Sequence, residues 1–241
     1  MAEKTHAGKL AVVTGGTRGI GRAVVEELRA RGADVIATGT NAAGDLPAGC
    51  RYVRLVLEDA RSVETMCALI AREAPHILIN NAGVSAPGAI DDLDMDEVAR
   101  VHDINLVAPL HLCRAALKGM TGHGWGRIVN LTAVSGIWGR KGRANYGSSK
   151  AGLDGMTASI AAEYGPHGVL ANCVAPGFIE TDVLRALYSA EQLKALADTV
   201  PVRRLGTAQA VAALVVWLAG TENTYVTAQN IVIDGGFGRA R

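Results

Sequence analysis

Short apolar runs alternate with longer segments of helical periodicity along the whole chain. Nearly continuous apolar runs are typical of strands buried on both faces, and the periodic segments between them are typical of helices that cover such a sheet. The alternation predicts an α/β fold, a single doubly wound Rossmann domain over residues 1–241 with a seven-stranded, mainly parallel sheet and helices on both faces. The predicted strands are residues 10–14, 34–38, 52–57, 77–80, 127–132, 170–174 and 230–234.

Glycine and proline mark where the predicted helices end or bend. Gly32 follows the first helix in the usual position of a left-handed cap, and Pro75 ends the second helix by residue 73 or 74. Pro109 lies inside the long third helix and predicts a kink near that point. The predicted helices are residues 22–31, 62–72, 94–117, 145–164 and 207–219, and a looser, mostly helical segment at about 178–200 is predicted to be a substrate lid.

Composition and charge exclude several classes of partner. The 241 residues are 49% hydrophobic, which allows one large core, and the formal net charge is only +1. No general field therefore draws nucleic acid or an acidic membrane surface. Residues 1–9 are polar, and the longest apolar run, residues 210–219, is far shorter than the roughly 20 residues that span a bilayer. We expect a cytoplasmic protein without nucleic-acid or membrane partners.

The four cysteines show no metal-binding or redox spacing. Cys50, Cys67, Cys113 and Cys173 form no C-x-x-C pair and have no convincing set of histidine partners. Free thiols in a reducing compartment are the expected state, and no metal site is predicted.

A glycine-rich loop, Thr14-Gly-Gly-Thr-Arg-Gly-Ile-Gly21, joins the first strand to the first helix. Glycines in this position allow a tight turn and close approach of the backbone, and the N-terminus of the helix offers free N–H groups to a pyrophosphate. A dinucleotide cofactor is therefore predicted. The loop residues expected to contact it are Gly15, Thr17, Arg18, Gly19, Ile20 and Gly21.

The end of the second strand predicts which dinucleotide is preferred. An acidic residue about 20 residues beyond the glycine loop would hold the ribose 2′-hydroxyl of NAD, but the chain reads Thr38-Gly-Thr-Asn41 there. Arg18 can pair with a 2′-phosphate, and Thr40 and Asn41 can add hydrogen bonds to it. NADP(H) is the expected cofactor.

Tyr146 and Lys150 are four residues apart, so a helix places them on one face. A nearby ammonium favours the phenolate and is expected to lower the pKa of Tyr146 from its ordinary value of about 10. Such a phenol can protonate an alkoxide or deprotonate an alcohol near neutral pH. The pair predicts proton transfer beside the cofactor.

With these motifs the chain resembles the short-chain dehydrogenase/reductases, and among them the 3-oxoacyl carrier-protein reductases. The matching segments are residues 14–21, Asn80-Asn-Ala-Gly83, Asn105 in Asp-Ile-Asn-Leu, Tyr146-x-x-x-Lys150, Ala175-Pro-Gly-Phe-Ile-Glu-Thr181 and residues 201–206. The resemblance covers nearly the whole chain and implies an NADPH-dependent ketoreductase.

The resemblance also implies a role for each matched residue. Tyr146 would be the general acid in reduction, Lys150 would hold the nicotinamide ribose and lower the tyrosine pKa, and Asn105 would hold a water in a proton relay. The further cofactor-binding residues that it implies are Asn81, Ala82 and Gly83 on the adenine-ribose side and Pro176, Gly177, Ile179 and Thr181 around the nicotinamide amide.

One departure from the family bears on the mechanism. The family has a serine 13 positions before the tyrosine to hold the substrate oxygen, and Ala133 stands there. Thr132 points to the opposite face if the strand continues, whereas Ser135 would share the face of Ala133. Three interpretations stay open: Ser135 or a water substitutes, the enzyme is natural but weakened, or the chain is a disabled variant.

The substrate is expected to be a ketone such as a 3-oxoacyl thioester. Ala133, Ser135, Tyr146 and the lid residue Leu184 are predicted to contact it. Docking of an acyl carrier protein stays open, because the family's basic docking positions hold Gly124 and His167 here. The basic residues nearby are interpreted as a solvated rim: Arg127, Arg140, Lys141 and Arg143.

Two other functions compete with the ketoreductase. An alcohol or dihydrodiol dehydrogenase would run the same chemistry in the oxidative direction. A weakly active or non-catalytic NADP-binding protein is favoured by Ala133 and disfavoured by the retained Tyr146, Lys150 and Asn105. A homotetramer is the assembly that the resemblance implies.

Overall fold

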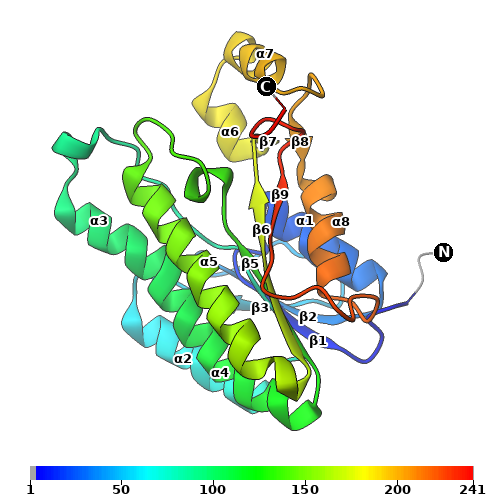
Figure 1. The fold of residues 1–241 in the computed structure, drawn as a ribbon. Coiled ribbons are helices and arrows are strands. Elements are labelled where there is room, and N and C mark those ends of the chain that lie inside the picture. The colour runs from blue at the N-terminus through cyan, green and yellow to red at the C-terminus, as the bar shows by residue number, and fades with distance from the viewer. Residues whose placement is uncertain (1–3, 241) are drawn as a thin grey trace.

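The computed structural model describes residues 4–240, with the exception of the side chains of Val183 and Leu187. Its central sheet has seven strands in the order β3-β2-β1-β4-β5-β6-β9, and every neighbouring pair is parallel (Figure 1). The predicted α/β fold class is confirmed. The strands are β1 (Leu10–Val13), β2 (Asp34–Gly39), β3 (Arg51–Arg54), β4 (Ile77–Asn80), β5 (Gly126–Leu131), β6 (Val169–Pro176) and β9 (Asn230–Ile233).

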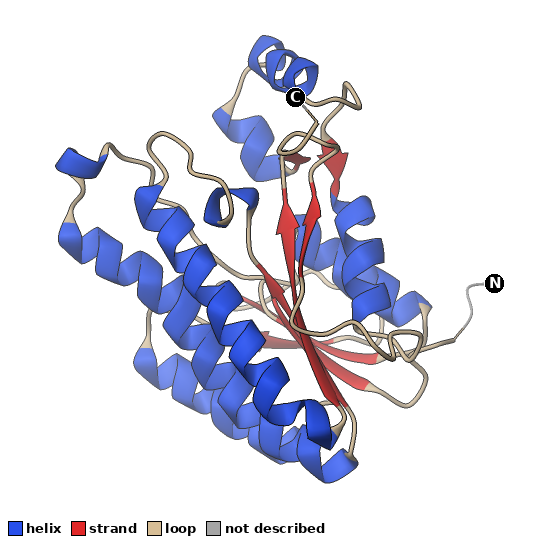
Figure 2. Cartoon of the chain, in the orientation of Figure 1, coloured by secondary structure: helices blue, strands red, loops and turns tan. Residues whose placement is uncertain are grey.

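Helices cover both faces of this sheet (Figure 2). Helices α1 (Gly19–Ala30) and α8 (Ala208–Leu218) lie on one face, and α2 (Ala60–Glu73), α4 (Ala108–His123) and α5 (Ala144–Tyr164) lie on the other. Among the described residues, none of the helices combines the length and apolarity that a membrane span requires.

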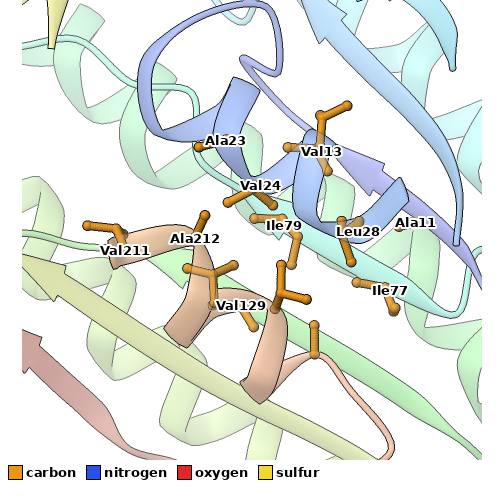
Figure 3. Close-up of a cluster of buried hydrophobic side chains, with 14 of the residues drawn as sticks. Ala11, Val13, Ala23, Val24, Leu28, Ile77, Ile79, Val129, Val211 and Ala212 are labelled. Atoms are coloured by element: carbon orange, nitrogen blue, oxygen red, sulfur yellow. The ribbon is translucent and has the colours of Figure 1, made fainter. Parts of the chain in front are cut away.

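Alternation along the strands divides the core into two layers. Val13 of β1 and Val129 of β5 pack with Val24 of α1 and Val211 of α8, as Figure 3 shows. The next residue back in β1, Val12, faces the helices on the other side. Successive strand residues point to opposite faces, so a sheet covered on both faces needs the nearly continuous apolar runs seen in the sequence.

The long third helix is interrupted just before its proline. It consists of α3 (Met95–His102), a π-helical turn η2 (Asp103–Val107) and α4, so the break lies next to Pro109, where the sequence predicts a kink. Pro109 follows the π turn and has no N–H to donate to the carbonyl of Asn105, four residues earlier. The N–H of Ala108 instead bonds to the carbonyl of Asp103, which widens the turn around Asn105. Such π turns often occur at functional sites.

The segment after β6 projects beyond the carboxyl ends of the strands (Figure 1). Strands β7 (Ile179–Glu180) and β8 (Gly206–Thr207) form a two-stranded parallel ribbon, which the sequence did not predict. Helices α6 (Asp182–Leu187) and α7 (Ala190–Thr199) lie between these two strands along the chain. Phe178 packs edge-on against Phe237, with ring centroids 5.0 Å apart, so the C-terminal segment contacts the base of the predicted lid. The remaining short helices are η1 (Ile90–Asp92), η3 (Val134–Gly136) and η4 (Gly165–His167).

Candidate active site

The glycine loop has the backbone that a dinucleotide requires. Gly15 and Gly19 adopt positive φ angles of 64° and 54°, which favour glycine. A Cβ on Gly21 would overlap the carbonyl oxygen of Gly15, so the third glycine lets α1 pack closely on the loop. Within residues 4–240, α1 has no side chain capping its first N–H groups and no acid in its first turn. This end of the helix therefore fits an anionic pyrophosphate.

Asn81 fastens the glycine loop to the end of β4. Its side-chain amide donates to the carbonyls of Thr14 (3.0 Å) and Gly15 (3.2 Å), and its main-chain N–H donates to the Thr14 hydroxyl (3.0 Å). The N–H of Ala82 donates to the same hydroxyl at 3.0 Å. The Asn81 side chain thus shapes the cofactor cradle, and Ala82 and Gly83 lie beside it.

The carboxyl end of β2 lies against the same loop. The N–H of Gly15 donates to the Thr38 hydroxyl at 3.3 Å, and a Cβ on Gly39 would lie 3.0 Å from a methyl carbon of Thr17. Thr40 and Asn41 follow at this edge, as expected. The first carboxylate beyond them, Asp45, pairs with Arg22 at 3.6 Å.

Lys150 is buried beside the carboxyl end of β5. Its Nζ atom donates to the carbonyl of Leu131 at 2.7 Å and lies 5.8 Å from the centre of the Tyr146 ring. A Cβ on Gly83 would be 3.3 Å from the same Nζ atom, so the loop after β4 closes over the ammonium. Burial lowers the pKa of Lys150 from 10.5 to about 8, because the charged form loses its hydration.

The pKa of Tyr146 moves in the direction opposite to the one expected from the sequence. Burial raises the pKa of the phenol, and the positive charge of Arg143 opposes this rise. The expected lowering by Lys150 is not seen in this structure, because desolvation penalises the phenolate and the ammonium alike.

Asn105 joins three segments of the site. Its Oδ1 atom accepts the N–H of Val84 at 2.9 Å, and its Nδ2 atom donates to the Val84 carbonyl (2.9 Å) and to the Ser149 hydroxyl (3.0 Å). The Ser149 hydroxyl in turn donates to the main-chain carbonyl of Tyr146 at 2.8 Å. The loop after β4, the π turn and α5 are therefore held together by one buried amide.

Ser149 is a supporting residue that the sequence analysis missed. It lies inside the Tyr146-Gly-Ser-Ser-Lys150 segment, on the face that turns toward Asn105. The sequence carries one signal: adjacent residues of a helix point in different directions, so only one of Ser148 and Ser149 can face the core, and in the structure it is Ser149.

The chain turns at Ala133, which changes the options for a substitute donor. Ala133 is buried and precedes the short helix η3, so strand alternation does not extend to Ser135. The Thr132 hydroxyl lies near the Val174 carbonyl (3.1 Å) and near Oδ1 of Asn230 (2.9 Å), away from the site as expected. Ser135 lines an open cavity of about 630 Å³, together with Ile137, Lys141, Gly147 and other residues, but Tyr146 does not line it.

The segment after β6 approaches the glycine loop. A Cβ on Gly19 would lie 3.6 Å from the Thr181 methyl carbon, and a Cβ on Gly177 would press against Asp234. Ile179 is buried in β7 after the end of β6 at Pro176. Thr181 caps α6 by accepting the N–H of Leu184 at 3.3 Å, and Leu184 is half-buried in the first turn of the lid.

The predicted basic rim is wrong for Arg127. This residue is 5% exposed at the amino end of β5, where its guanidinium stacks on Trp125 at 4.3 Å. Its Nη atoms donate to the carbonyls of Gly126, Gly168 and Asn223. Arg140 lies over the Phe178 ring at 4.8 Å, and Arg143 donates to the Ser85 hydroxyl at 2.6 Å.

The comparisons with known proteins agree with this geometry. A family model described as "Enoyl-(Acyl carrier protein) reductase" matches residues 15–238. The 3-oxoacyl-[acyl-carrier-protein] reductase of Salmonella typhimurium is 40% identical over 237 residues, which cover 95% of this chain and 97% of the relative. The corresponding reductase of Pseudomonas aeruginosa is 40% identical over 241 residues, which cover 95% of this chain and 97% of that relative.

A solved structure described as a short chain dehydrogenase/reductase family protein superposes with a TM-score of 0.88 at 35% identity. The superposition covers 97% of this chain and 99% of that one. Sequence and structure therefore agree along nearly the full length. The chain belongs to the short-chain dehydrogenase/reductase family and is an oxidoreductase acting on CH–OH groups.

Proposed function

We propose that the protein is an NADPH-dependent ketoreductase, with a 3-oxoacyl thioester or a similar ketone as substrate. The observation that carries the proposal is the half-buried Tyr146 beside the buried Lys150, whose Nζ atom lies next to the loop after β4 that also holds the glycine loop. The names of the bacterial relatives support the substrate class, because those proteins are 3-oxoacyl-[acyl-carrier-protein] reductases.

The cofactor supplies the hydride, and the residues of the chain manage the proton. The Tyr146 phenol protonates the oxygen of the reduced carbonyl, so one hydride on carbon and one proton on oxygen give the alcohol. Lys150, whose Nζ atom lies 5.8 Å from the centre of the Tyr146 ring, would hold the nicotinamide ribose, as the resemblance implies. The side-chain amide of Asn105 already bonds to Val84 and Ser149. In this proposal a main-chain carbonyl of the π turn therefore accepts the hydrogen bond from the water of the proton relay.

The cofactor is held at two points. The N-terminus of α1 and Gly15, Gly19 and Gly21 would hold the pyrophosphate, and Arg18, Thr40 and Asn41 would bind a ribose 2′-phosphate. Pro176, Gly177, Ile179 and Thr181 would frame the nicotinamide amide, as the resemblance implies, and of these Thr181 lies against the glycine loop, since a Cβ on Gly19 would be 3.6 Å from its methyl carbon.

The cavity beside Ser135 is the substrate entrance in this proposal. Exposed Ile90 and Ile137 line it together with Arg140, Lys141 and Arg143 and one acid, Asp91, so it offers an apolar wall with a rim of net positive charge. That combination suits an apolar acyl chain on an anionic pantetheine carrier. On these grounds we propose an acyl carrier protein as a partner. Because Ala133 stands at the position of the family's serine, the carbonyl oxygen of the substrate lacks one hydrogen-bond donor.

Consumption of NADPH in the presence of a ketone panel, including 3-oxoacyl thioesters, tests the proposal. Loss of the reduced-nicotinamide absorbance with NADPH, and slower loss with NADH, is the expected result. Binding of NADPH without turnover of any ketone would favour the non-catalytic alternative, and turnover only of alcohols with NADP⁺ would favour the dehydrogenase.

We also propose a homotetramer built on α4 and α5, as the family resemblance implies. Val107, just before α4, and Leu110 in its first turn are 39% and 48% exposed, which is high for large apolar side chains. Sedimentation of the protein as a monomer would contradict this assembly.

A further inference from the structure

Arg54 lies at the edge of the site where the adenosine ribose is expected, although it belongs to none of the matched motifs. It is the last residue of β3 and pairs in register with Gly39 of β2. Its Nε atom donates to the main-chain carbonyl of Thr40 at 3.0 Å. The guanidinium is therefore tied to the residue that follows β2, where the two cofactor types are distinguished.

The charge of Arg54 is not neutralised by a carboxylate. None of the ion pairs between described residues includes it, and its two terminal nitrogens have no hydrogen-bond partner there. The next acids along the chain have other partners, since Glu58 pairs with Arg100 at 2.9 Å and Asp59 accepts the N–H of Arg61 at 3.0 Å. Arg54 thus presents free N–H donors and a full positive charge.

The neighbouring backbone holds this arginine in place. The Tyr52 hydroxyl donates to the carbonyl of Asn41 at 2.6 Å, and the N–H of Leu55 donates to the carbonyl of Gly39 at 2.8 Å. Both sides of Thr40 are therefore bonded to β3 or its extension. The glycine loop lies close to this backbone as well, because a Cβ on Gly39 would be 3.0 Å from a methyl carbon of Thr17, the residue before Arg18.

We propose that Arg54 is a second cation for the ribose 2′-phosphate and sets the preference for NADP(H) together with Arg18. The inference rests on the proposed NADPH-dependent function and extends it to a residue on a different strand. A dianionic phosphate between two guanidinium groups receives charge-assisted hydrogen bonds from both, and these are stronger than bonds between neutral groups. An unphosphorylated ribose gains nothing comparable from Arg54.

Binding of two nucleotides without a nicotinamide tests this role independently of turnover. The probes are 2′,5′-ADP and 5′-AMP, which differ by the 2′-phosphate, and calorimetry on the full chain gives both dissociation constants. We expect Arg54→Met to weaken 2′,5′-ADP binding by about tenfold or more, which is the effect of losing a charged hydrogen bond, and to change 5′-AMP binding less than twofold.

Arg51→Met is the matched control, because Arg51 lies on the same strand but pairs with Glu73 at 2.8 Å. It should leave both dissociation constants unchanged, and Arg54→Lys should restore part of the discrimination. Equal weakening of the two probes by Arg54→Met would assign Arg54 only the support of Thr40 and overturn the proposal.

The same measurements distinguish an incorrect role for Arg54 from an incorrect preference for NADP(H). If the wild-type protein discriminates between the probes and Arg54→Met retains that discrimination, only the role of Arg54 is refuted. If the wild-type protein binds both probes equally, the preference for NADP(H) is refuted as well.

Discussion

Lys150 and Arg127 are both buried cations without a carboxylate partner in the described part of the chain, but they lie at opposite ends of β5. Arg127 gives its N–H groups to three main-chain carbonyls and stacks on Trp125. Lys150 has one bond, to the Leu131 carbonyl. Burial lowers the pKa of Arg127 to about 10 and that of Lys150 to about 8.

The difference separates a structural cation from a functional one. A guanidinium with a pKa near 10 stays charged at neutral pH, and its two Nη atoms donate to three carbonyls, so it holds strands and loops together. An ammonium with a pKa near 8 and two further N–H bonds to offer can respond to a ligand or to pH. Carboxyl ends of parallel strands are also where ligands bind in such sheets.

Replacing Arg127 should cause the largest loss of stability. Arg127→Met leaves the carbonyls of Gly126, Gly168 and Asn223 without this donor, and we expect a loss of about 3 kcal/mol in the free energy of unfolding. Urea titration measures it. The exposed Arg72, which pairs with Glu73 at the surface, is the control, and Arg72→Met should change stability by less than about 0.5 kcal/mol.

Replacing Lys150 should impair the reaction instead of the fold. Lys150→Met is expected to lower the rate of ketone reduction by about 100-fold, the usual scale of a proton-transfer contribution, with stability retained or increased. Steady-state kinetics and urea titration on the same preparation check both parts. If Lys150→Met is largely unfolded but its folded fraction reduces the ketone at the wild-type rate, Lys150 is a structural cation and not a functional one.

Restoring a hydroxyl at position 133 should have a smaller effect. Ala133→Ser is expected to raise ketone reduction by roughly tenfold, a fraction of the 100- to 1,000-fold that a lost oxyanion donor costs elsewhere. The kcat for one ketone at saturating NADPH is the measurement. If Ser135 already supplies the donor, Ser135→Ala lowers the wild-type rate and Ala133→Ser gives no gain.

The last expected effect is a pH dependence of stability, which is spread over more than two pH units. Between the pKa of about 8 in the folded state and the ordinary 10.5, the unfolded chain binds a proton at Lys150 that the folded chain does not. Stability from this group therefore rises with pH across that window, by less than about 1.4 kcal/mol per pH unit. The difference in unfolding free energy between the wild type and Lys150→Met isolates it, and a difference that falls with pH would contradict the burial of the charge.

The strands and most helices could be predicted because their signals are local. Apolar runs gave β4 its observed limits, and α5 began one residue before its prediction. The short ribbon of β7 and β8 could not be predicted, and Pro109 predicted a break in the third helix but not its π-helical form. Two-residue strands carry no period, and the Asn105 side chain in the π turn bonds to Val84 and Ser149 from distant segments.

The candidate site was predictable to the extent that motifs fix residue types. The Tyr146 and Lys150 spacing and the glycine loop appear where they were expected. The sign of the Tyr146 pKa shift was not predictable, because it depends on how deeply the helix is buried. The burial of Arg127 was missed for the same reason, because the sequence does not reveal whether a charged residue at the end of a strand is buried.

We propose that Tyr146, with Lys150 beside it, gives the proton to the reduced carbonyl, while the bound cofactor would supply the hydride. Ketone reduction by Tyr146→Phe, measured with NADPH binding on the same sample, tests it most directly. We expect a fall in rate of 100-fold or more with an unchanged dissociation constant for NADPH. A rate equal to that of the wild type would contradict it.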